Sequence, residues 1–201
     1  MKKVLIGFVA VLFAVALLPQ SGAANVGIKG GFALSNLRFS NAGEVGTLSN
    51  LSSMVGGVSL GMNLGLFCIQ PEILYVRMGA KQVYDSVSAE THLDYVQVPL
   101  FLKINVMPGP VSPMIYGGGY GSYLLSAKGV IAGESQDIKD EVKSTDYGLV
   151  FGGGVDFKLA VVKLTAEIRY NLGLANIAKN PDPVTLTVKN KSLMFLVGVT
   201  F

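Results

Sequence analysis

Apolar and polar residues alternate along much of this chain, and the last ten residues show the pattern most clearly. Leu193, Phe195, Val197, Val199 and Phe201 share one face of an extended segment, while the intervening residues face the other way. In a soluble protein such a strand would leave an apolar edge that invites aggregation. In a closed membrane barrel the apolar face meets lipid and closure removes the edge. The pattern therefore predicts the closing strand of a transmembrane β-barrel.

Eight segments of this kind follow one another, at about 26–38, 54–66, 67–78, 93–106, 114–127, 147–157, 162–172 and 192–201. Each is close to the ~9–11 residues that a tilted strand needs to cross a bilayer. In the fifth segment the sequence does not decide which face meets lipid, because both faces carry a row of apolar or aromatic residues. The competing rows are Tyr116, Tyr120 and Leu124, and Ile115, Tyr123 and Leu125.

The connections between these segments alternate in length. Short ones lie around Gly65, at 108–113 and at 158–161, and long ones at 39–53, 79–92, 128–146 and 173–191. Outer-membrane barrels have short periplasmic turns and longer extracellular loops. We therefore predict an all-β, eight-stranded, antiparallel, up-and-down transmembrane β-barrel over residues 25–201, with both termini in the periplasm.

A soluble, lipocalin-like barrel is the alternative fold. It would place rows of mid-strand glycines on the surface, which is a poor use of exposed positions. A narrow membrane barrel instead turns the same glycines toward a crowded interior, where small residues are needed. The 25 glycines of the chain also argue against a helical protein.

The first 24 residues have the features of a secretory signal peptide. Lys2 and Lys3 form a basic start, 4–18 is a continuous apolar run, and 19–24 supplies a proline and small residues. Cleavage after Ala24 or after Ala23 fits this pattern. The alternative, a membrane anchor helix, needs ~20 apolar residues, more than this run provides. Export and a barrel fold together predict the outer membrane of a Gram-negative bacterium.

Composition narrows the range of partners. Half of the residues are hydrophobic, yet no second apolar run is long enough for a spanning helix. Of the 16 basic residues, Lys2 and Lys3 belong to the predicted signal peptide, which leaves 14 against 13 acidic residues. No basic patch with interleaved aromatics is present, so nucleic acid is not an expected partner. The single cysteine, Cys68, cannot form an internal disulfide and is expected to be a small buried residue.

Several short motifs, in this order and spacing, resemble the PorT-like outer-membrane β-barrel domain of Bacteroidetes-type bacteria. They are GIKGGF (27–32), SNL (35–37), QPEILY (70–75), VPLFLK (98–103), GGGY (117–120), YLLSAK (123–128), DYG (146–148), GGG (152–154) and RYNLGL (169–174). The resemblance implies an OmpA-like eight-stranded barrel. The founding member of that family is associated with assembly of a protein-secretion and gliding apparatus, a role that fold alone does not transfer. The final strand also resembles the signal that marks outer-membrane proteins for insertion, carried here by Phe195, Val197, Val199 and Phe201.

The inward face of the predicted barrel carries charged residues, namely Lys29, Glu72, Lys103, Asp156, Lys163, Glu167 and Arg169. An eight-stranded barrel is just wide enough inside for side chains to fill it. Because a lone buried charge is costly, these groups are expected to pair as a structural network. Glu72 and Lys103 lie on adjacent strands at similar predicted depth, and Glu167 and Arg169 share one face. A proton path or narrow ion pathway is the alternative interpretation.

Catalysis is weakly supported. The only histidine, His92, is close in sequence to Asp94 and to Ser86 and Ser88, residue types that can build a hydrolytic group. However, the segment lacks a nucleophile elbow or an oxyanion-hole glycine pattern. One histidine and one cysteine also give no metal-ligand spacing. We therefore expect no enzymatic activity, no cofactor and no metal.

The expected function is a structural or partner-binding role in the outer membrane, accessory to a secretion or surface complex. The segment 128–146 has the mixed charge of a solvated loop, and loops are where binding residues concentrate. The expected partners are outer-membrane lipid, the barrel-insertion machinery and another envelope protein. A narrow porin-like channel and a lipid-modifying enzyme are the alternatives.

Overall fold

The computed structural model describes residues 24–40, 49–84, 87–107, 109–131, 133–179 and 187–201. Its strands are β1 (Ala24–Ser40), β2 (Ser49–Leu64), β3 (Phe67–Tyr84), β4 (Val87–Asn105), β5 (Val111–Ile131), β6 (Glu134–Asp137), β7 (Thr145–Lys158), β8 (Lys163–Gly173) and β9 (Thr187–Thr200). A single-turn 3₁₀ helix, η1 (Lys139–Glu141), follows β6. No helix within the described ranges has the length and apolarity needed to cross a membrane.

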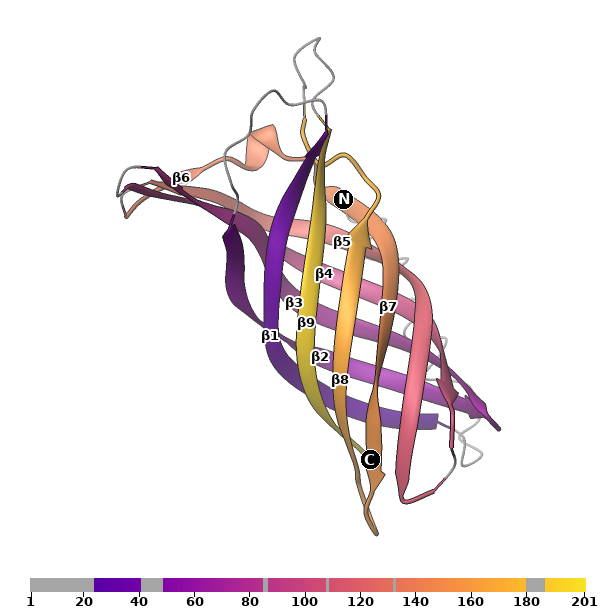
Figure 1. The fold of residues 1–201 in the computed structure, drawn as a ribbon. Helices are drawn as coiled ribbons and strands as arrows, with labels where there is room; N and C mark the ends of the chain where they lie inside the picture. Colours follow the sequence, from indigo (N-terminus) through magenta and orange to yellow (C-terminus); the bar gives the residue numbers. More distant parts are fainter. Residues whose placement is uncertain (1–23, 41–48, 85–86, 108, 132, 180–186) are drawn as a thin grey trace.

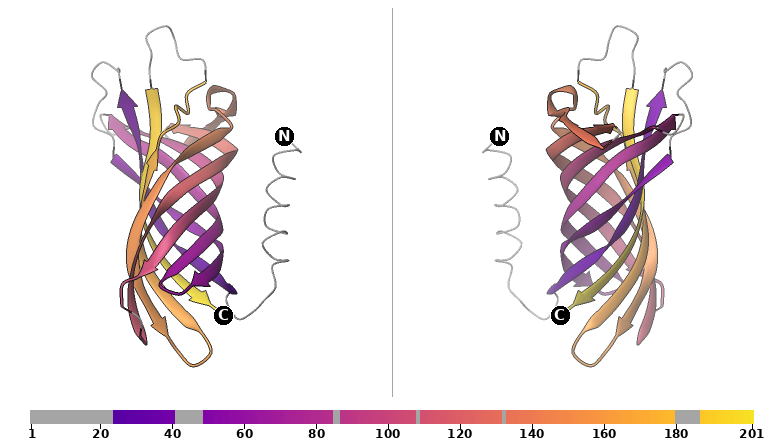
Figure 2. Two further views of the ribbon diagram at one scale, coloured as in Figure 1. Left: turned by 90° about the vertical axis from the view of Figure 1, so that its right-hand side faces the viewer. Right: turned by 90° about the vertical axis from the view of Figure 1, so that its left-hand side faces the viewer.

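The strands close into an antiparallel barrel (Figures 1 and 2). Their order is β4-β3-β2-β1-β9-β8-β7-β5, and β4 also pairs with β5, so neither side of the sheet is left open. The short β6 pairs only with the end of β5 and stands outside the closed ring. The closing pair is β1 with β9, and beyond it the Phe201 amide donates to the Val26 carbonyl at 2.9 Å. The prediction of an eight-stranded antiparallel barrel is confirmed.

The two ends of the barrel differ. One end, here called the turn end, holds the short β2–β3, β4–β5 and β7–β8 connections together with Phe201 (Figure 1). Gly65 makes the β2–β3 turn there with a φ of 75°, a conformation that favours glycine. The other end, here called the extended end, carries β6, η1 and the outer parts of β3, β4 and β5 (Figures 1 and 2).

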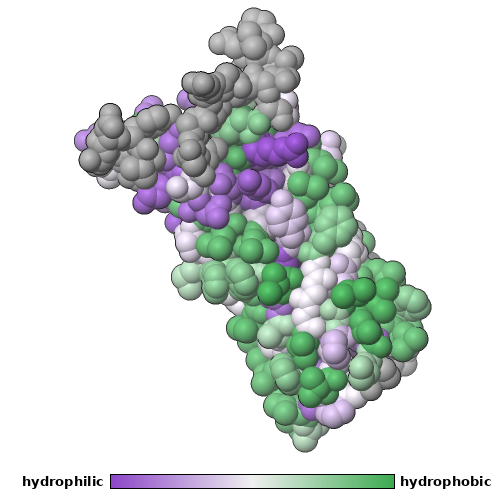
Figure 3. All heavy atoms as spheres, viewed as in Figure 1, coloured by the Kyte–Doolittle hydropathy of each residue, from purple (hydrophilic) through white to green (hydrophobic). Residues whose placement is uncertain are grey.

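Alternation along the strands separates an apolar outside from a mixed inside. In β8, Leu164, Ile168 and Tyr170 are exposed, while Glu167 and Arg169 between them are buried. Figure 3 shows hydrophobic residues over the body of the barrel and hydrophilic ones toward the extended end. Three exposed phenylalanines, Phe67, Phe157 and Phe201, lie at the turn end. Farther along the wall, Phe32 and Phe151 are exposed together with the tyrosines Tyr75, Tyr147 and Tyr170. This arrangement is the one expected of a barrel surrounded by lipid.

The prediction of four long loops is wrong for 79–92. β3 and β4 stay paired from Arg77–Asp94 out to Tyr84–Val87, so this region is a two-stranded extension of the barrel wall. The strands of the barrel are 11 to 21 residues long, and all except β8 are longer than predicted. The physical reason is that alternation continues past the apolar band with charged residues on the outside. An outward row that is polar does not stand out as a membrane strand in the sequence.

The residues of β5 that point into the barrel change from even to odd positions at a β-bulge. Tyr116, Tyr120 and Leu124 point inward, and Ile115 and Leu125 point outward. The register with β4 shifts between Asp94 and Tyr95, which leaves Leu125 as an extra residue. Beyond the bulge, the inward positions change from even to odd numbers, and Ala127 is buried. The two rows compete in the sequence because the inward face of β5 before the bulge is lined by aromatic and apolar side chains, as the outward face is.

Glycines on the inward face make room for large neighbours. Gly152 lies opposite Tyr116, and an added Cβ there would meet the ring and hydroxyl of Tyr116. Gly148 lies opposite Tyr120 in the same way. Cys68 is buried on the inward face. The predicted signal peptide lies outside the described residues except for Ala24, where β1 begins.

Candidate functional site

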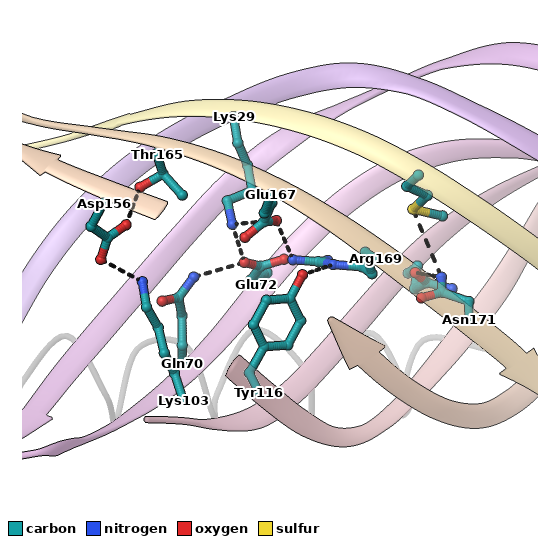
Figure 4. A network of polar contacts seen from close by, with 12 residues as sticks. Lys29, Gln70, Glu72, Lys103, Tyr116, Asp156, Thr165, Glu167, Arg169 and Asn171 are labelled. Atoms are coloured by element: carbon teal, nitrogen blue, oxygen red, sulfur yellow. Dashed lines mark hydrogen bonds and ion pairs between the residues drawn. The ribbon is translucent and has the colours of Figure 1, made fainter. Parts of the chain in front are cut away.

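The candidate site is the set of charged side chains inside the barrel (Figure 4). We call it the charged network, and it consists of Lys29 (β1), Glu72 (β3), Lys103 (β4), Asp156 (β7), and Glu167 and Arg169 (β8). Each residue occupies an inward position of its strand, and all six are buried. Strands far apart in sequence therefore bring both signs of charge into one narrow interior.

Arg169 is the centre of this network. Its Nη1 lies 2.7 Å from Glu72 Oε2 and its Nη2 lies 2.7 Å from Glu167 Oε1. Lys29 Nζ joins the same two carboxylates, at 2.6 Å from Glu72 and 3.1 Å from Glu167. Two cations and two anions thus form a closed group in which every charge faces two opposite charges. Such mutual pairing is what allows charges to remain in a low-dielectric interior.

Aromatic rings hold the Arg169 guanidinium from the β4–β5 side. Its Cζ lies 5.2 Å from the centre of the Phe101 ring and 5.4 Å from that of Tyr116, at cation–π distance. Arg169 Nε also donates to the Tyr116 hydroxyl at 3.1 Å. With a relative exposure of 0%, Arg169 is fixed by partners on all sides.

Lys103 and Asp156 form a second pair nearer the turn end. Lys103 Nζ lies 2.8 Å from Asp156 Oδ2, and the Thr165 hydroxyl donates to Asp156 Oδ1 at 2.7 Å. Lys163, which the sequence also placed inside, lies 3.6 Å from the same carboxylate. The Gln70 amide donates to Glu72 Oε1 at 2.8 Å and extends the polar contacts toward this pair.

Glu72 and Lys103, which the sequence placed at similar depth on adjacent strands, do not form an ion pair with each other. The β3–β4 register places Lys103 opposite Cys68, four residues from Glu72, so Lys103 reaches across to Asp156 on β7. The structure does bring Glu167 and Arg169 together. Inward facing follows from alternation, whereas pairing depends on register, which a single sequence does not specify.

A polar column that was not predicted from the sequence lies beside the charged network. The Asn171 amide donates to Gln97 at 2.9 Å, and that of Gln97 lies 3.3 Å from the Ser122 hydroxyl. Farther along, Asp146 accepts from Asn190 at 2.9 Å and from the Tyr120 hydroxyl at 3.3 Å. The strand periodicity could have identified these residues, because all of them occupy inward positions.

The interior toward the extended end is instead filled by an apolar cluster, here called the apolar half. Its members are Ala33, Leu37, Val55, Leu74, Val76, Met78, Ala80, Leu93, Tyr95, Leu124, Ala127, Ile177, Val188, Met194 and Leu196. Ile138, Val142 and Ala178, from the segments after β6 and β8, pack against it. This end of the barrel is therefore filled mainly by apolar side chains, with the buried pair Asp146 and Asn190 among them.

Little open space remains inside. At the turn end a hollow of about 380 Å³ is lined by Asn25, Asn105, Lys158 and Lys163, among others. Deeper in, the space next to Lys29 and Lys103 amounts to about 10 Å³, room for roughly one water molecule. Asp156 of the charged network is among the residues that line the hollow.

The residues considered for catalysis pair with other side chains and not with one another. His92 Nε2 lies 2.9 Å from Glu90 Oε2, whereas Asp94 is held by Arg77 at 2.6 Å. Ser86 lies outside the described residues, and the side chain of Ser88 is not described. Hydrogen bonds from Lys81 and then His92 hold the pKa of Glu90 below its ordinary value. The described residues contain no group of three or more His, Cys, Asp or Glu side chains that could hold a metal ion.

The predicted insertion-signal residues all lie on the outward face of the closing strand and its end. Phe195 stacks on Phe32 of β1 with ring centres 5.0 Å apart. Val197 and Phe201 are among the most exposed apolar residues, at 65% and 66%. Recognition of these side chains by an insertion machinery stays a prediction.

Known outer-membrane proteins share this architecture. A family model described as outer membrane protein beta-barrel domain matches residues 19–179. The crystal structure of Neisserial surface protein A (NspA) has 17% sequence identity and a TM-score of 0.54, over 88% of this chain and 95% of that one. The N-terminal β-barrel domain of Pseudomonas aeruginosa OprF has 11% identity and a TM-score of 0.40, over 88% and 97% of the two chains. At this identity the likeness to NspA shows the fold alone, and no curated protein sequence matches the chain.

Proposed function

The chain belongs to the outer membrane protein beta-barrel domain family, and we propose that it serves as a sealed barrel that presents a binding surface at its extended end. The observation that carries the proposal is the division of the molecule into a filled interior and a wall that continues beyond the apolar band. In this proposal the barrel lies in the outer membrane of a Gram-negative bacterium, with the turn end in the periplasm and the extended end outside.

The filled interior supports a role other than transport. To pass the Arg169 group, a solute would have to separate Arg169 and Lys29 from Glu72 and Glu167, all of which are buried. Breaking a buried pair exposes an uncompensated charge and costs several kcal/mol, about 3–5 for removal of one partner. A closed barrel of this kind acts through its surfaces.

The extension of β3 and β4 supports partner binding. Beyond the apolar band, its outward face carries cross-strand ion pairs, Arg77 with Asp94 and Lys81 with Glu90. A paired sheet that holds charges at a defined register is a suitable surface for specific protein recognition, since complementary charge gives specificity. The partner class that fits is another envelope protein. The PorT-like resemblance supports the narrower proposal that this partner belongs to a secretion or surface complex.

A catalytic role is not part of the proposal. His92 and Asp94 would have to act together in catalysis. His92 is instead paired with Glu90, and Asp94 with Arg77. The remaining partners in the proposal are the outer-membrane lipid around the apolar band and the machinery that inserts the barrel.

Photo-crosslinking in intact outer membranes tests the proposed surface. A crosslinking residue replaces Lys128, exposed on the extended end, or Lys158, exposed at the turn end as the matched control. The proposal expects a discrete protein adduct from position 128 and none from position 158. An adduct from position 158 alone, or none from either position, would contradict it.

Cysteine labelling tests the orientation separately. A single cysteine at position 128 should react in intact cells with a membrane-impermeant maleimide, and one at position 158 should react only after the outer membrane is opened. The native Cys68 is buried, so the wild-type protein should not be labelled and serves as the negative control. Reversed labelling would overturn the orientation and leave the sealed-barrel proposal standing.

A further inference from the structure

The seam between β1 and β9 carries three cations on its outward face. Arg38 lies directly opposite Lys189, and Lys191 lies two residues farther along β9, opposite Asn36. The neighbours of the two lysines along the strand, Val188 and Asn190, are buried, so the lysines point away from the barrel. We call Arg38, Lys189 and Lys191 the basic seam.

The basic seam differs from the other charged part of the wall at this end. On β3 and β4 each cation faces an acid, because Arg77 opposes Asp94 and Lys81 opposes Glu90. On β1 and β9 a cation faces a cation. Directly opposed like charges destabilise a strand pair, whereas opposed unlike charges stabilise it. Among the residues that the structure describes, no acidic side chain lies within ion-pair distance of the three cations.

The position of the seam indicates what could neutralise it. Toward the turn end, the same outward rows become apolar at once, with Leu34 opposite Leu193 and then Phe32 stacked on Phe195. Figure 3 looks onto the β1–β9 side and shows hydrophilic residues above the hydrophobic ones there. The cations therefore stand where the apolar band ends, at the depth of lipid headgroups.

We propose that the basic seam binds the phosphate of an anionic lipid headgroup in the leaflet at the extended end. The lipid chains would lie along the apolar row that begins at Leu34 and Leu193. Arginine can hold two phosphate oxygens at once, and the lysines act as point charges beside it. The phosphate removes the repulsion between Arg38 and Lys189 and connects β1 to β9 at the seam that closes the barrel.

Thermal unfolding in mixed micelles tests this site. The refolded barrel is placed in a neutral detergent, and phosphatidylglycerol or phosphatidylcholine of the same chain length is added in steps. We expect the midpoint to rise with phosphatidylglycerol and to stay nearly constant with phosphatidylcholine, since a ligand that binds the folded state stabilises it. Each basic residue near an anionic surface increases binding about fivefold at moderate salt. The variant R38Q/K189Q/K191Q should therefore lose the response to phosphatidylglycerol.

A matched variant separates the seam from net charge. K128Q/K143Q/K179Q removes the same number of charges from exposed positions elsewhere on the extended end and should keep the response. A response lost equally in both variants would overturn the proposal. Inorganic phosphate at the same concentration should leave the midpoint unchanged, and an equal rise would show a free-anion site instead of a lipid site.

The substitution Lys189→Glu gives a second readout of opposite sign. In neutral detergent alone it should raise the midpoint above that of the wild type, because Arg38 then faces an acid. On addition of phosphatidylglycerol it should respond less than the wild type. A lower midpoint in detergent together with an intact lipid response would contradict the proposal, since it would show that the seam needs no anion.

Discussion

The two halves of the barrel interior are filled by opposite chemistries within the same ring of strands. Toward the turn end, the charged network places Lys29 and Arg169 between Glu72 and Glu167. Toward the extended end, the apolar half packs Leu74, Leu93, Met194 and their neighbours. β3 contributes to both halves, with Glu72 and Leu74 at successive inward positions. One strand thus passes from one kind of interior to the other within two residues.

This difference determines how much a substitution in each half destabilises the barrel. In the apolar half each side chain contributes through its own burial, so a loss is limited to one cavity. In the charged network each group depends on the charge of another, so removal of one partner leaves a buried charge behind. The apolar half supplies stability, and the network blocks the interior with groups that hold one another in place.

The largest effect is expected from Arg169→Met. Loss of the guanidinium leaves Glu72 and Glu167 with Lys29 as their remaining cation, and we expect the free energy of unfolding to fall by about 3–5 kcal/mol. Urea unfolding of the barrel refolded into lipid vesicles measures this change. Arg77→Met is the control, because its ion pair with Asp94 is partly exposed and worth about 0–1 kcal/mol. Equal losses in the two variants would show that the buried Arg169 group contributes no more than an exposed ion pair.

A smaller effect is expected from Leu74→Ala in the apolar half. Leu74 is fully buried, and its truncation leaves a cavity that costs about 3 kcal/mol. Leu74→Met conserves volume and should cost less than about 1.5 kcal/mol. Both values come from the same urea unfolding experiment. If Leu74→Met were as damaging as Leu74→Ala, the simple packing description of this half would be wrong.

Gly152→Ala examines the contact between the strand wall and the network. The added methyl group would meet the Tyr116 ring, and the Tyr116 hydroxyl accepts a hydrogen bond from Arg169, so we expect a loss of about 1–3 kcal/mol. Gly121→Ala is the matched control on β5, because nothing lies within 4 Å of its added Cβ. We expect that variant to be neutral or slightly stabilising. A neutral Gly152→Ala would show that Tyr116 is free to move.

The smallest effect is expected outside both halves, at Glu90 on the extended wall. Hydrogen bonds from Lys81 and His92 lower the pKa of Glu90 in the folded state from its ordinary value of 4.5. A lowered folded-state pKa stabilises the fold above about pH 4.5, and this contribution is lost as the pH falls through the lowered value. Unfolding midpoints measured between neutral pH and pH 3 should therefore fall slightly less for Glu90→Gln than for the wild type. An identical pH dependence would show that the pair contributes nothing.

Much of the fold could be predicted from the sequence, because the period of two decides which residues face inward. The same rule identified the members of the charged network. What it could not supply is register. Lys103 meets Asp156 instead of Glu72 because of the β3–β4 offset, and the extra residue Leu125 reverses the phase of β5. Both depend on pairing between strands, which alternation within one strand does not encode.

The extent of the strands was also beyond the sequence pattern. Past Tyr75 the outward residues of β3 become Arg77 and Lys81, so the apolar signal ends while the strand continues. The inward residues Met78 and Ala80 continue the core, and cross-strand ion pairs cover the outside. Chain patterns mark where lipid contact ends, and the structure shows that the sheet extends beyond that point.

Planar-bilayer conductance of the refolded barrel tests most directly whether the charged network seals the interior. The wild type should give no discrete conductance steps over a wide voltage range. The variant K29A/E72A/E167A/R169A removes the four mutually paired side chains and, if it refolds to a heat-modifiable barrel, should give steps that the wild type lacks. Reproducible, ion-selective openings in the wild type would contradict the sealed barrel and favour a narrow channel along the polar column of Asn171, Gln97 and Ser122.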